Sequence, residues 1–586
     1  MAVPSRSAGI SASDEGWAGG RKTRSPARPL VDRAVQIGVY VVVAALVAAP
    51  ILPIIGQSFR STPLYDETGV WTLGEYAELA TDREFWRAVA NTLIFGIGAT
   101  IIAQVVGVAL AILVGRTDLP GRRALAAIAT WPIYVSHLVL AFGWIIAYGP
   151  AGFVTLWAQQ VFGEAPWSLY NLAGLSFAAG LSMAPLTYLY CVGASRTIDA
   201  SLENAARLCG AGPFRAMLSV TLPMLRPAII ASAILNFVLA IELLVMPLLL
   251  AAPSGIEFLT TFIYSRGFEA STPRHGLVAA VAVVLLLVVT ALVLIQMKLV
   301  GDGRRFVTVG GKAARPRRIP LGRMKWPLFA LVAAFDLFFV VLLLGGLVAR
   351  AFTSVLSPFV PLGEALTLDN FQIIFDYEQY VRSIWNTLLV AVIGGTIGTA
   401  LVAAAALVSL RSDMPGRGGL AFLSVYPRAV PGVLVGMGVL WAAGWFPAIA
   451  LLQNTIWILV IAFVMRHLPT GWGAVQPAVL QITRDHDRAA RISGAGWTRM
   501  ATGILLPQMR PALLACFVLL FVHFIKEYAA AVFLFAPGSE VMGTTMLTFW
   551  IQGENGAVAA LAALQIAIVA VFVLLLGRIS KGAAHD

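Results

Sequence analysis

Long apolar runs alternate with short polar segments along most of the chain. The runs are about 20 residues or longer, which is the length an α-helix needs to cross the hydrocarbon core of a bilayer. They predict an all-α polytopic membrane protein with about 12 transmembrane helices, six on each side of a basic segment at 300–325. The predicted spans are 34–57, 87–114, 124–148, 170–194, 226–252 and 276–299, and then 326–350, 384–410, 419–443, 448–468, 511–536 and 557–577.

The two halves of the chain repeat one another in sequence. The polar segments 199–227 and 483–511 share an acidic residue, an Ala-Ala pair, a Gly and a Leu-Pro pair at an offset of 284 residues. A second shared pattern, Arg-x-x-x-Asn-Thr-Leu, begins at Arg87 and again at Arg382, an offset of 295. Repeats at this scale indicate two units of one topology. With six spans each, we expect two parallel repeats related by an axis along the membrane normal.

The charged residues indicate how the chain lies in the membrane. The chain is 59% hydrophobic and 12% charged, which is too apolar for a soluble domain. Its net charge is +12, but 32 of the 41 Lys and Arg residues fall in segments that the positive-inside rule places in the cytosol together with both termini. We therefore predict no nucleic-acid partner. The predicted parts are a disordered cytosolic tail at 1–32, a first half at 33–299, a basic cytosolic linker at 300–325 and a second half at 326–580.

The two repeated polar segments resemble the EAA loop of ABC importer permeases, which has the pattern E-A-A-x-x-x-G followed by I-x-L-P. The matching residues are Glu203, Ala205, Ala206, Gly210, Leu222 and Pro223 in the first copy, and Asp487, Ala489, Ala490, Gly494, Leu506 and Pro507 in the second. The residue types suit a helix-turn-helix, because alanine favours a helix and glycine permits a sharp turn. The alternative is an amphipathic helix that only connects two spans. Its recurrence at matched places in both halves favours the EAA loop.

The resemblance covers about residues 33–580 and implies the fold of a type I ABC importer permease. It further implies two ABC ATPase subunits docked on the two loops, an extracytoplasmic substrate-binding protein, and a place in a bacterial cytoplasmic (inner) membrane. The chain is most similar to the branch with iron(III) permeases, and thiamine, polyamine and phosphonate permeases are nearby alternatives. A Walker A pattern is missing from the sequence, so we expect ATP and magnesium on the partner subunits, with no cofactor and no enzymatic activity in this chain. A secondary transporter driven by an ion gradient is the alternative from another class.

Polar residues inside predicted spans are candidates for the translocation path, because they are costly to place in lipid. Glu242 and Glu527 follow Arg226 and Arg510 by 16 and 17 residues, about 24 Å along a helix, which places them nearer the outer face than the midplane. They either face the path or an outer gate, or pair locally at the interface with neighbouring side chains.

The other polar residues in the spans allow simpler interpretations. Asn91 and Asn386 recur in the repeat, and hydrogen bonding between helices is favoured over a role in the path. Asp336 is predicted to have a packing role. His137 and His467 each lack a second ligand one helical turn away, so we predict no metal site. The acidic outer loop 58–85, with Glu364, Asp369, Asp376 and Glu378, either receives a basic rim of the binding protein or is simply solvated.

Overall fold

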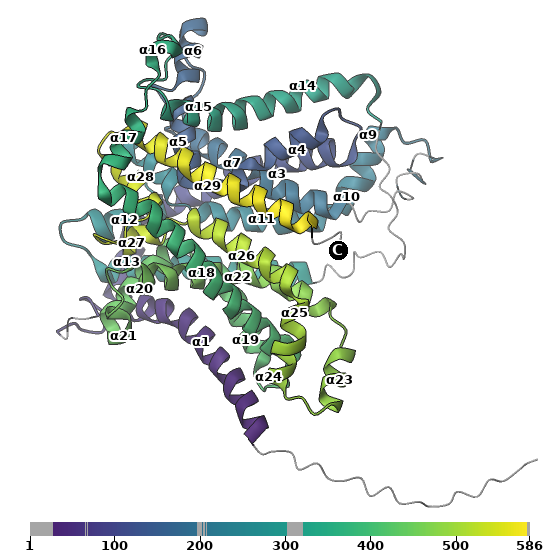
Figure 1. Ribbon diagram of the computed structural model, residues 1–586. Coiled ribbons are helices and arrows are strands. Elements are labelled where there is room, and N and C mark those ends of the chain that lie inside the picture. The colour runs from purple at the N-terminus through teal and green to yellow at the C-terminus, as the bar shows by residue number, and fades with distance from the viewer. Residues whose placement is uncertain are drawn as a thin grey trace, which may run out of the picture.

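The computed structural model describes residues 27–582, except positions 65, 67, 196–201, 203–204, 207 and 302–319. The described part of the chain is helical, and its only β-pairing is two isolated bridges. Figure 1 shows the helices as one bundle, with the short helices of the two repeated loops at one end and α6, α12, α16, α17 and α27 at the other. Most of the predicted tail 1–32 and linker 300–325 lies outside the described residues. Residues 27–32, however, already belong to the first helix, so the tail prediction is wrong there.

Nine helices in the described part are long and apolar enough to cross a membrane, and up to thirteen if each of four bent pairs counts as one span. The long helices include α1 (Ala27–Gln57), α3 (Arg83–Arg116), α7 (Leu172–Ser195), α13 (His275–Gly301), α18 (Glu378–Arg411), α22 (Ile456–Gln481) and α29 (Asn555–Gly582). Two further long spans are composite, joining α5 (His137–Tyr148) to α6 (Phe153–Phe162), and α14 (Lys325–Asp336) to α15 (Leu342–Ala351). This confirms a polytopic helical membrane protein of about the predicted number of spans.

The third predicted span of each half is not continuous. In the first half it divides into α4 (Arg122–Thr130), a 3-10 turn and α5. In the second half α19 (Arg417–Val425) and α20 (Gly432–Trp445) also follow one another through a 3-10 turn, and the chain bends by 110° between them. Proline explains the breaks, because its ring removes an N–H from the helix ladder. Pro132 and Pro427 occupy equivalent turns.

The fifth predicted span of each half also ends early. Helix α11 (Arg226–Ile241) ends before Glu242, and α26 (Arg510–Ile525) ends before Lys526, where irregular segments begin. The predicted spans 226–252 and 511–536 are therefore wrong in their outer thirds. The predicted span 448–468 is also misplaced, because α22 begins at Ile456 and extends to Gln481.

The first helix of each half packs against the other half. Helix α1 lies along α20, α18 and α19 of the second half, whereas α14 contacts α4 and α15 contacts α5 of the first half. Within the halves, α3 packs on α7 and α11, and α18 packs on α22 and α26 in the same way. The bounds of α3 and α18 differ at both ends by the 295-residue offset of the sequence repeat. The chain is thus a pseudosymmetric pair with exchanged first helices.

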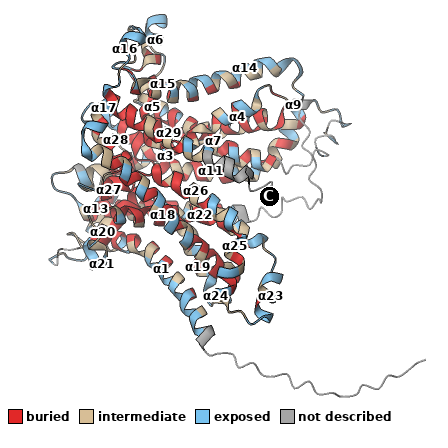
Figure 2. Ribbon diagram, viewed as in Figure 1, coloured by how far each residue is buried: buried red, intermediate tan, exposed pale blue. Residues whose placement is uncertain are grey.

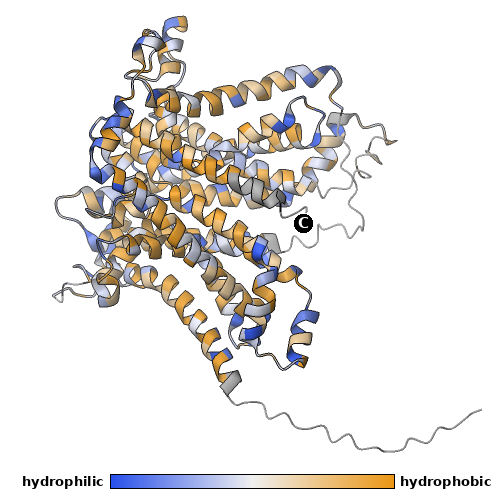
Figure 3. Ribbon diagram, in the orientation of Figure 1, coloured by the Kyte–Doolittle hydropathy of each residue, from blue (hydrophilic) through white to orange (hydrophobic). Residues whose placement is uncertain are grey.

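The outer surface of the bundle is apolar, as contact with lipid requires. Figure 2 shows buried residues concentrated at the centre of the bundle and exposed residues on its periphery, and Figure 3 shows that many peripheral helix faces are hydrophobic. On α3, the exposed stripe consists of Leu93, Ile94, Ile97, Ile101 and Val105. Such a stripe is unfavourable in water and favourable against acyl chains.

Candidate functional site

The second repeated loop is a helix, a glycine turn and a second helix, as the resemblance implied. Helix α23 (Asp485–Ile492) is followed by a turn in which Gly494 has φ of 74°, and then by α24 (Trp497–Met500). A positive φ favours glycine, because other residues meet a clash with their own Cβ. Of the predicted alanines, Ala490 is buried against the bundle and Ala489 faces outward.

The first repeated loop has the same turn where it is described. Gly210 has φ of 84°, and the loop continues into α9 (Pro213–Ala216). Ala205 and Ala206 are helical, whereas Glu203 lies outside the described residues. The two loops therefore share their turn geometry, and the roles of the predicted residues in contact with an ATPase stay predictions.

Both loops lead into a π-helical turn and then a sharp bend. The π-helical turns η2 (Met217–Thr221) and η10 (Ala501–Leu505) are offset by the same 284 residues as the sequence repeat. The bends that follow, before α11 and α26, measure 57° and 76°. Leu222-Pro223 and Leu506-Pro507 form the short helical turns between the π-helix and the bend in each half, which gives these predicted residues a structural reason for their repetition.

Each loop also presents one large apolar side chain to solvent at the same repeat position. Leu208 is 90% exposed and Ile492 is 87% exposed. A single exposed apolar residue needs no explanation, but its recurrence at matched places makes this exposure a shared feature of the two loops. The sequence analysis did not single out this pair, although the 284-residue offset relates them.

A cluster of charged side chains joins the two halves inside the bundle. The Arg466 guanidinium on α22 lies 2.9 Å from Glu527 and 3.7 Å from Glu242, which belongs to the first half. His467 approaches the same Glu527 carboxylate, with its Nε2 3.0 Å from Oε2. Glu242 and Glu527 therefore meet at one basic residue, Arg466, which the sequence analysis did not single out. Glu242 and Glu527 both pair with neighbouring side chains and lie between the two halves.

Glu242 and Glu527 do not occupy equivalent positions in the two halves. Glu242 and Lys526 occupy the same position, directly after α11 and α26, and they differ by the 284-residue offset. Glu527 is thus displaced by one residue from the counterpart of Glu242. Lys526 donates to the backbone oxygen of Ile133 in the first half at 2.6 Å, and Ser136 of the first half lies 3.2 Å from Gln565 of the second.

The repeated asparagines fasten an irregular segment of their own half. Asn91 donates to the backbone oxygen of Glu257 at 2.9 Å, and Asn386 donates to those of Gly538 and Glu540 at 3.0 and 2.9 Å. The neighbouring threonines accept from the first amides of the following helices, Thr92 from Leu259 and Thr387 from Met542. Asn91 and Asn386 therefore bond to the backbone of irregular segments and not to another helix, so the favoured interpretation of hydrogen bonding between helices is wrong in its partner.

Several acids of the predicted outer loop pair within the chain. Glu78 and Glu75 lie beside Arg274, and Glu84 pairs with Arg266. The hydrogen bond from Arg274 lowers the pKa of Glu78, whereas burial raises the pKa of Glu75. The pairs connect loop 58–85 to the segment before α13. They leave the exposed acids of the second half, Glu364, Asp369 and Asp376, as the freer part of the predicted docking surface.

Further charged side chains lie away from this cluster. Asp336 is buried at the end of α14, and neither of its carboxylate oxygens has a hydrogen-bond partner in the described part of the chain. Asp32 on α1 reaches the second repeated loop. Arg116 and Arg411, which end α3 and α18, are also buried, and their repetition at the 295-residue offset was a signal that the sequence analysis did not use.

Comparison with known proteins defines the class to which these features belong. The family model "Binding-protein-dependent transport system inner membrane component" matches residues 83–305 and 397–584, one region in each half. The chain belongs to this family, and is accordingly a permease component of an ABC importer with two repeated units in one chain.

The chain is similar to several individual proteins of known name. The chain is 26% identical to the "Putative ferric transport system permease protein FbpB 1" of Haemophilus influenzae. The match covers 78% of this chain and 71% of that protein. The chain is 25% identical over 83% of its length to 70% of the "Ferric transport system permease protein FbpB" of Actinobacillus pleuropneumoniae. It is also similar to a solved bacterial ABC transporter that imports alginate, with 19% identity and a TM-score of 0.37 over 44% of this chain and 96% of that one.

Proposed function

We propose that the chain is the membrane subunit of an ATP-driven importer of iron(III), powered by two separate ATPase subunits. The observation that carries the ATPase contact is the pair of matched loops, each with a glycine turn and an exposed apolar residue, Leu208 or Ile492. The chain itself binds no cofactor in this proposal, and ATP and magnesium belong to the partner subunits.

Iron(III) is supported by the names of two relatives, both ferric transport permeases at about a quarter identity. A binding protein delivers the substrate at the end of the bundle opposite the two loops, and both termini lie in the cytosol with the loops. Movement of the loops then alters the contact between the halves, where Glu242 and Glu527 share Arg466. This is alternating access between two repeats.

The test is reconstitution of the chain with its co-purified ATPase and a binding protein in vesicles. Uptake of radioactive iron(III) that requires ATP and is stopped by vanadate supports the proposal. Competition by thiamine, a polyamine or a phosphonate would assign the substrate to one of the alternative classes. Uptake that persists without an ATPase but collapses with an uncoupler would instead identify a secondary transporter.

A further inference from the structure

The second loop is fastened to the membrane helices first through Arg411. This residue ends α18, and only 4% of its side chain is exposed. Its guanidinium lies 3.1 Å from the carboxylate of Asp487 on α23, and it donates to the backbone oxygens of Val479 and Ile482 at the end of α22. A buried guanidinium is stable only while its partners stay in place. Arg411 therefore holds the first helix of the loop to α18 and α22.

The second attachment comes from the other half of the molecule. Asp32, near the start of α1, accepts hydrogen bonds from the backbone N–H of Trp497 at 2.7 Å and of Thr498 at 2.9 Å, and from the Thr498 hydroxyl at 2.6 Å. These amides are at the start of α24, where no helical carbonyl is available to them. The Asp32 carboxylate thus caps the second helix of the loop from the first helix of the first half.

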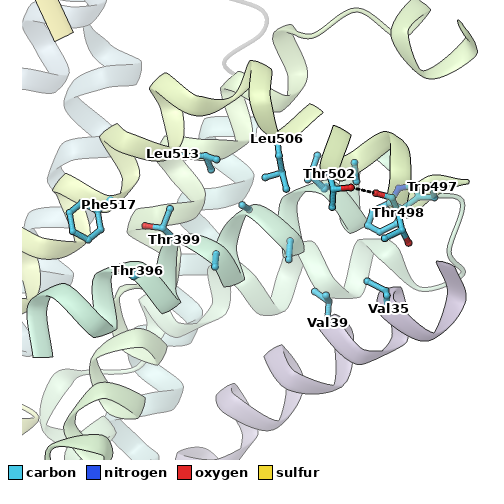
Figure 4. A pocket seen from close by; sticks show the side chains of 15 residues that line it. Val35, Val39, Thr396, Thr399, Trp497, Thr498, Thr502, Leu506, Leu513 and Phe517 are labelled. Atoms are coloured by element: carbon cyan, nitrogen blue, oxygen red, sulfur yellow. Dashed lines mark hydrogen bonds between the residues drawn. The ribbon is translucent and has the colours of Figure 1, made fainter. Parts of the chain in front are cut away.

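Hollows lie on both sides of α1 next to this attachment. An apolar groove of about 490 Å³ lies between α1, α18 and the helix that continues α24. Figure 4 shows Val35 and Val39 of α1 facing it on one side, with Thr498 and Thr502 across from them. A second hollow of about 990 Å³ lies on the other side of α1 and includes Asp32 in its lining.

The first loop is not built to accept the same cap. Pro213 stands at the position of Trp497, 284 residues earlier, and proline has no N–H to donate. Gly212 stands at the position of Gly496. A Cβ at Gly496 would come within 2.8 Å of the Asp32 carboxylate, whereas a Cβ at Gly212 would have nothing within 4 Å. Arg411 has a counterpart in the first half, Arg116, but the aspartate cap is found only at the second of the two loops as described.

We propose that Asp32 is a positioning residue for the second ATPase-docking loop. Through it, α1 holds α24 beside α18 and carries part of the movement of this loop into the bundle. The inference rests on the proposed function for the identity of the loop's partner, but the attachment itself is a property of the chain alone. The test accordingly has one arm without an ATPase and one with it.

The first arm measures hydrogen exchange of peptides that span 497–500 in the purified full chain. Asp32→Ala should accelerate exchange there by about tenfold or more, as expected when amides lose hydrogen bonds to a charged acceptor. Gly496→Ala should act in the same direction by displacing the carboxylate. Gly212→Ala, the matched change in the first loop, should leave exchange at 497–500 unchanged. Equal exchange in Asp32→Ala and the unchanged chain would overturn the proposal.

The second arm measures the substrate imported per ATP hydrolysed in vesicles that hold the complex, with radioactive iron(III) as the probe. Asp32→Ala should retain ATP hydrolysis but lower this ratio by about two- to thirtyfold, the range of coupling changes at such positions. Faster exchange with an unchanged ratio would overturn the role in transmission. If the unchanged chain neither binds an ATPase nor imports iron(III), the proposed function fails, and the exchange arm still decides whether Asp32 fixes α24.

Discussion

The side chains of Glu242 and Arg466 come from opposite halves of the chain, and their charged atoms lie 3.7 Å apart inside the bundle. Arg466 lies closer still to Glu527 of its own half, at 2.9 Å. One guanidinium is therefore shared between two carboxylates that the halves contribute separately. Because buried charges need their partners, any movement that separates the halves must leave Glu242 without Arg466 or bring a substitute.

Replacing Arg466 by leucine should destabilise the protein by about 3–5 kcal/mol, because two buried carboxylates would lose their common partner. The measurement is the thermal unfolding midpoint of the detergent-purified chain. Arg484→Leu, at an exposed position beyond the end of α22, is the control for a lost positive charge. A loss for Arg466→Leu no larger than that of the control would contradict the buried ion pair.

Glu242→Gln separates the stability of the cluster from its role between the halves. Arg466 keeps Glu527 in this variant, so we expect a smaller loss of stability than in Arg466→Leu, about 1–3 kcal/mol. If Glu242 has a role in the gate, iron(III) uptake should change at equal abundance in the membrane. Uptake equal to that of the unchanged chain, in a variant with both Glu242→Gln and Glu527→Gln, would remove these residues from the proposed path.

The two repeated asparagines should differ in their contribution. Asn386 donates to two backbone oxygens and Asn91 to one. At about 0.5–1.5 kcal/mol for each hydrogen bond, Asn386→Ala should cost about twice as much stability as Asn91→Ala. Thermal unfolding of the two variants side by side provides the measurement. An equal cost would show that one of the two hydrogen bonds of Asn386 contributes nothing, and a reversed order would contradict the prediction.

The sequence was most informative where one residue type has one structural meaning. Gly210 and Gly494 were predicted to form turns, and both have a positive φ. The repeat offset predicted two equivalent units, and the helix bounds follow it closely. These features depend on local geometry, which a short segment of sequence specifies by itself.

Contacts between distant segments were beyond the reach of the sequence. Hydropathy finds apolar runs but cannot tell a straight span from one broken near Pro132 or at Glu242, because both halves of a broken span remain apolar. It also gave no reason to single out Arg466, since a basic residue near the end of a predicted span resembles a topology signal. The packing of α1 on the opposite half has no local signature, and with it the cap that Asp32 forms was missed.

The contact between Arg274 and Glu78 should make the outer loop sensitive to acid. The hydrogen bond lowers the pKa of Glu78 below its ordinary value of 4.5. A lowered pKa means that the stabilisation is complete above pH 4.5 and is lost as the pH falls through the lowered value. Burial raises the pKa of Glu75, so protonation of this residue on acidification stabilises the folded loop. Its effect is opposite to that of Glu78.

Hydrogen exchange of loop 68–82 against pH, in the Glu75→Gln background, checks this prediction. Protection, which is the exchange rate corrected for the intrinsic pH dependence of amide exchange, should fall as the pH falls below 4.5, and adding Arg274→Gln should make protection low at every pH and remove the dependence. The partners are partly exposed, so the size of the effect should fall with added salt. A pH dependence that survives Arg274→Gln would assign the sensitivity to other groups.

The glycine turns of the two loops allow a graded test of their geometry. Gly210 and Gly494 have open space around them, so alanine at either position would be disfavoured by the positive φ alone, at about 1–2 kcal/mol. Asparagine tolerates this backbone region better, so Gly494→Asn should cost less than Gly494→Ala.

The control is Gly503→Ala, in the helical turn that follows, where the space around the glycine is equally open. This change should be neutral or stabilising, because alanine favours a helix. The amount of ATPase that co-purifies and the thermal unfolding midpoint should both be highest for Gly503→Ala, lower for Gly494→Asn and lowest for Gly494→Ala. Equal ATPase binding in all three variants would show that the glycine turn at Gly494 has no part in docking. The ATPase contact would then depend on other surfaces of the loop, and Ile492 would be the first to be tested.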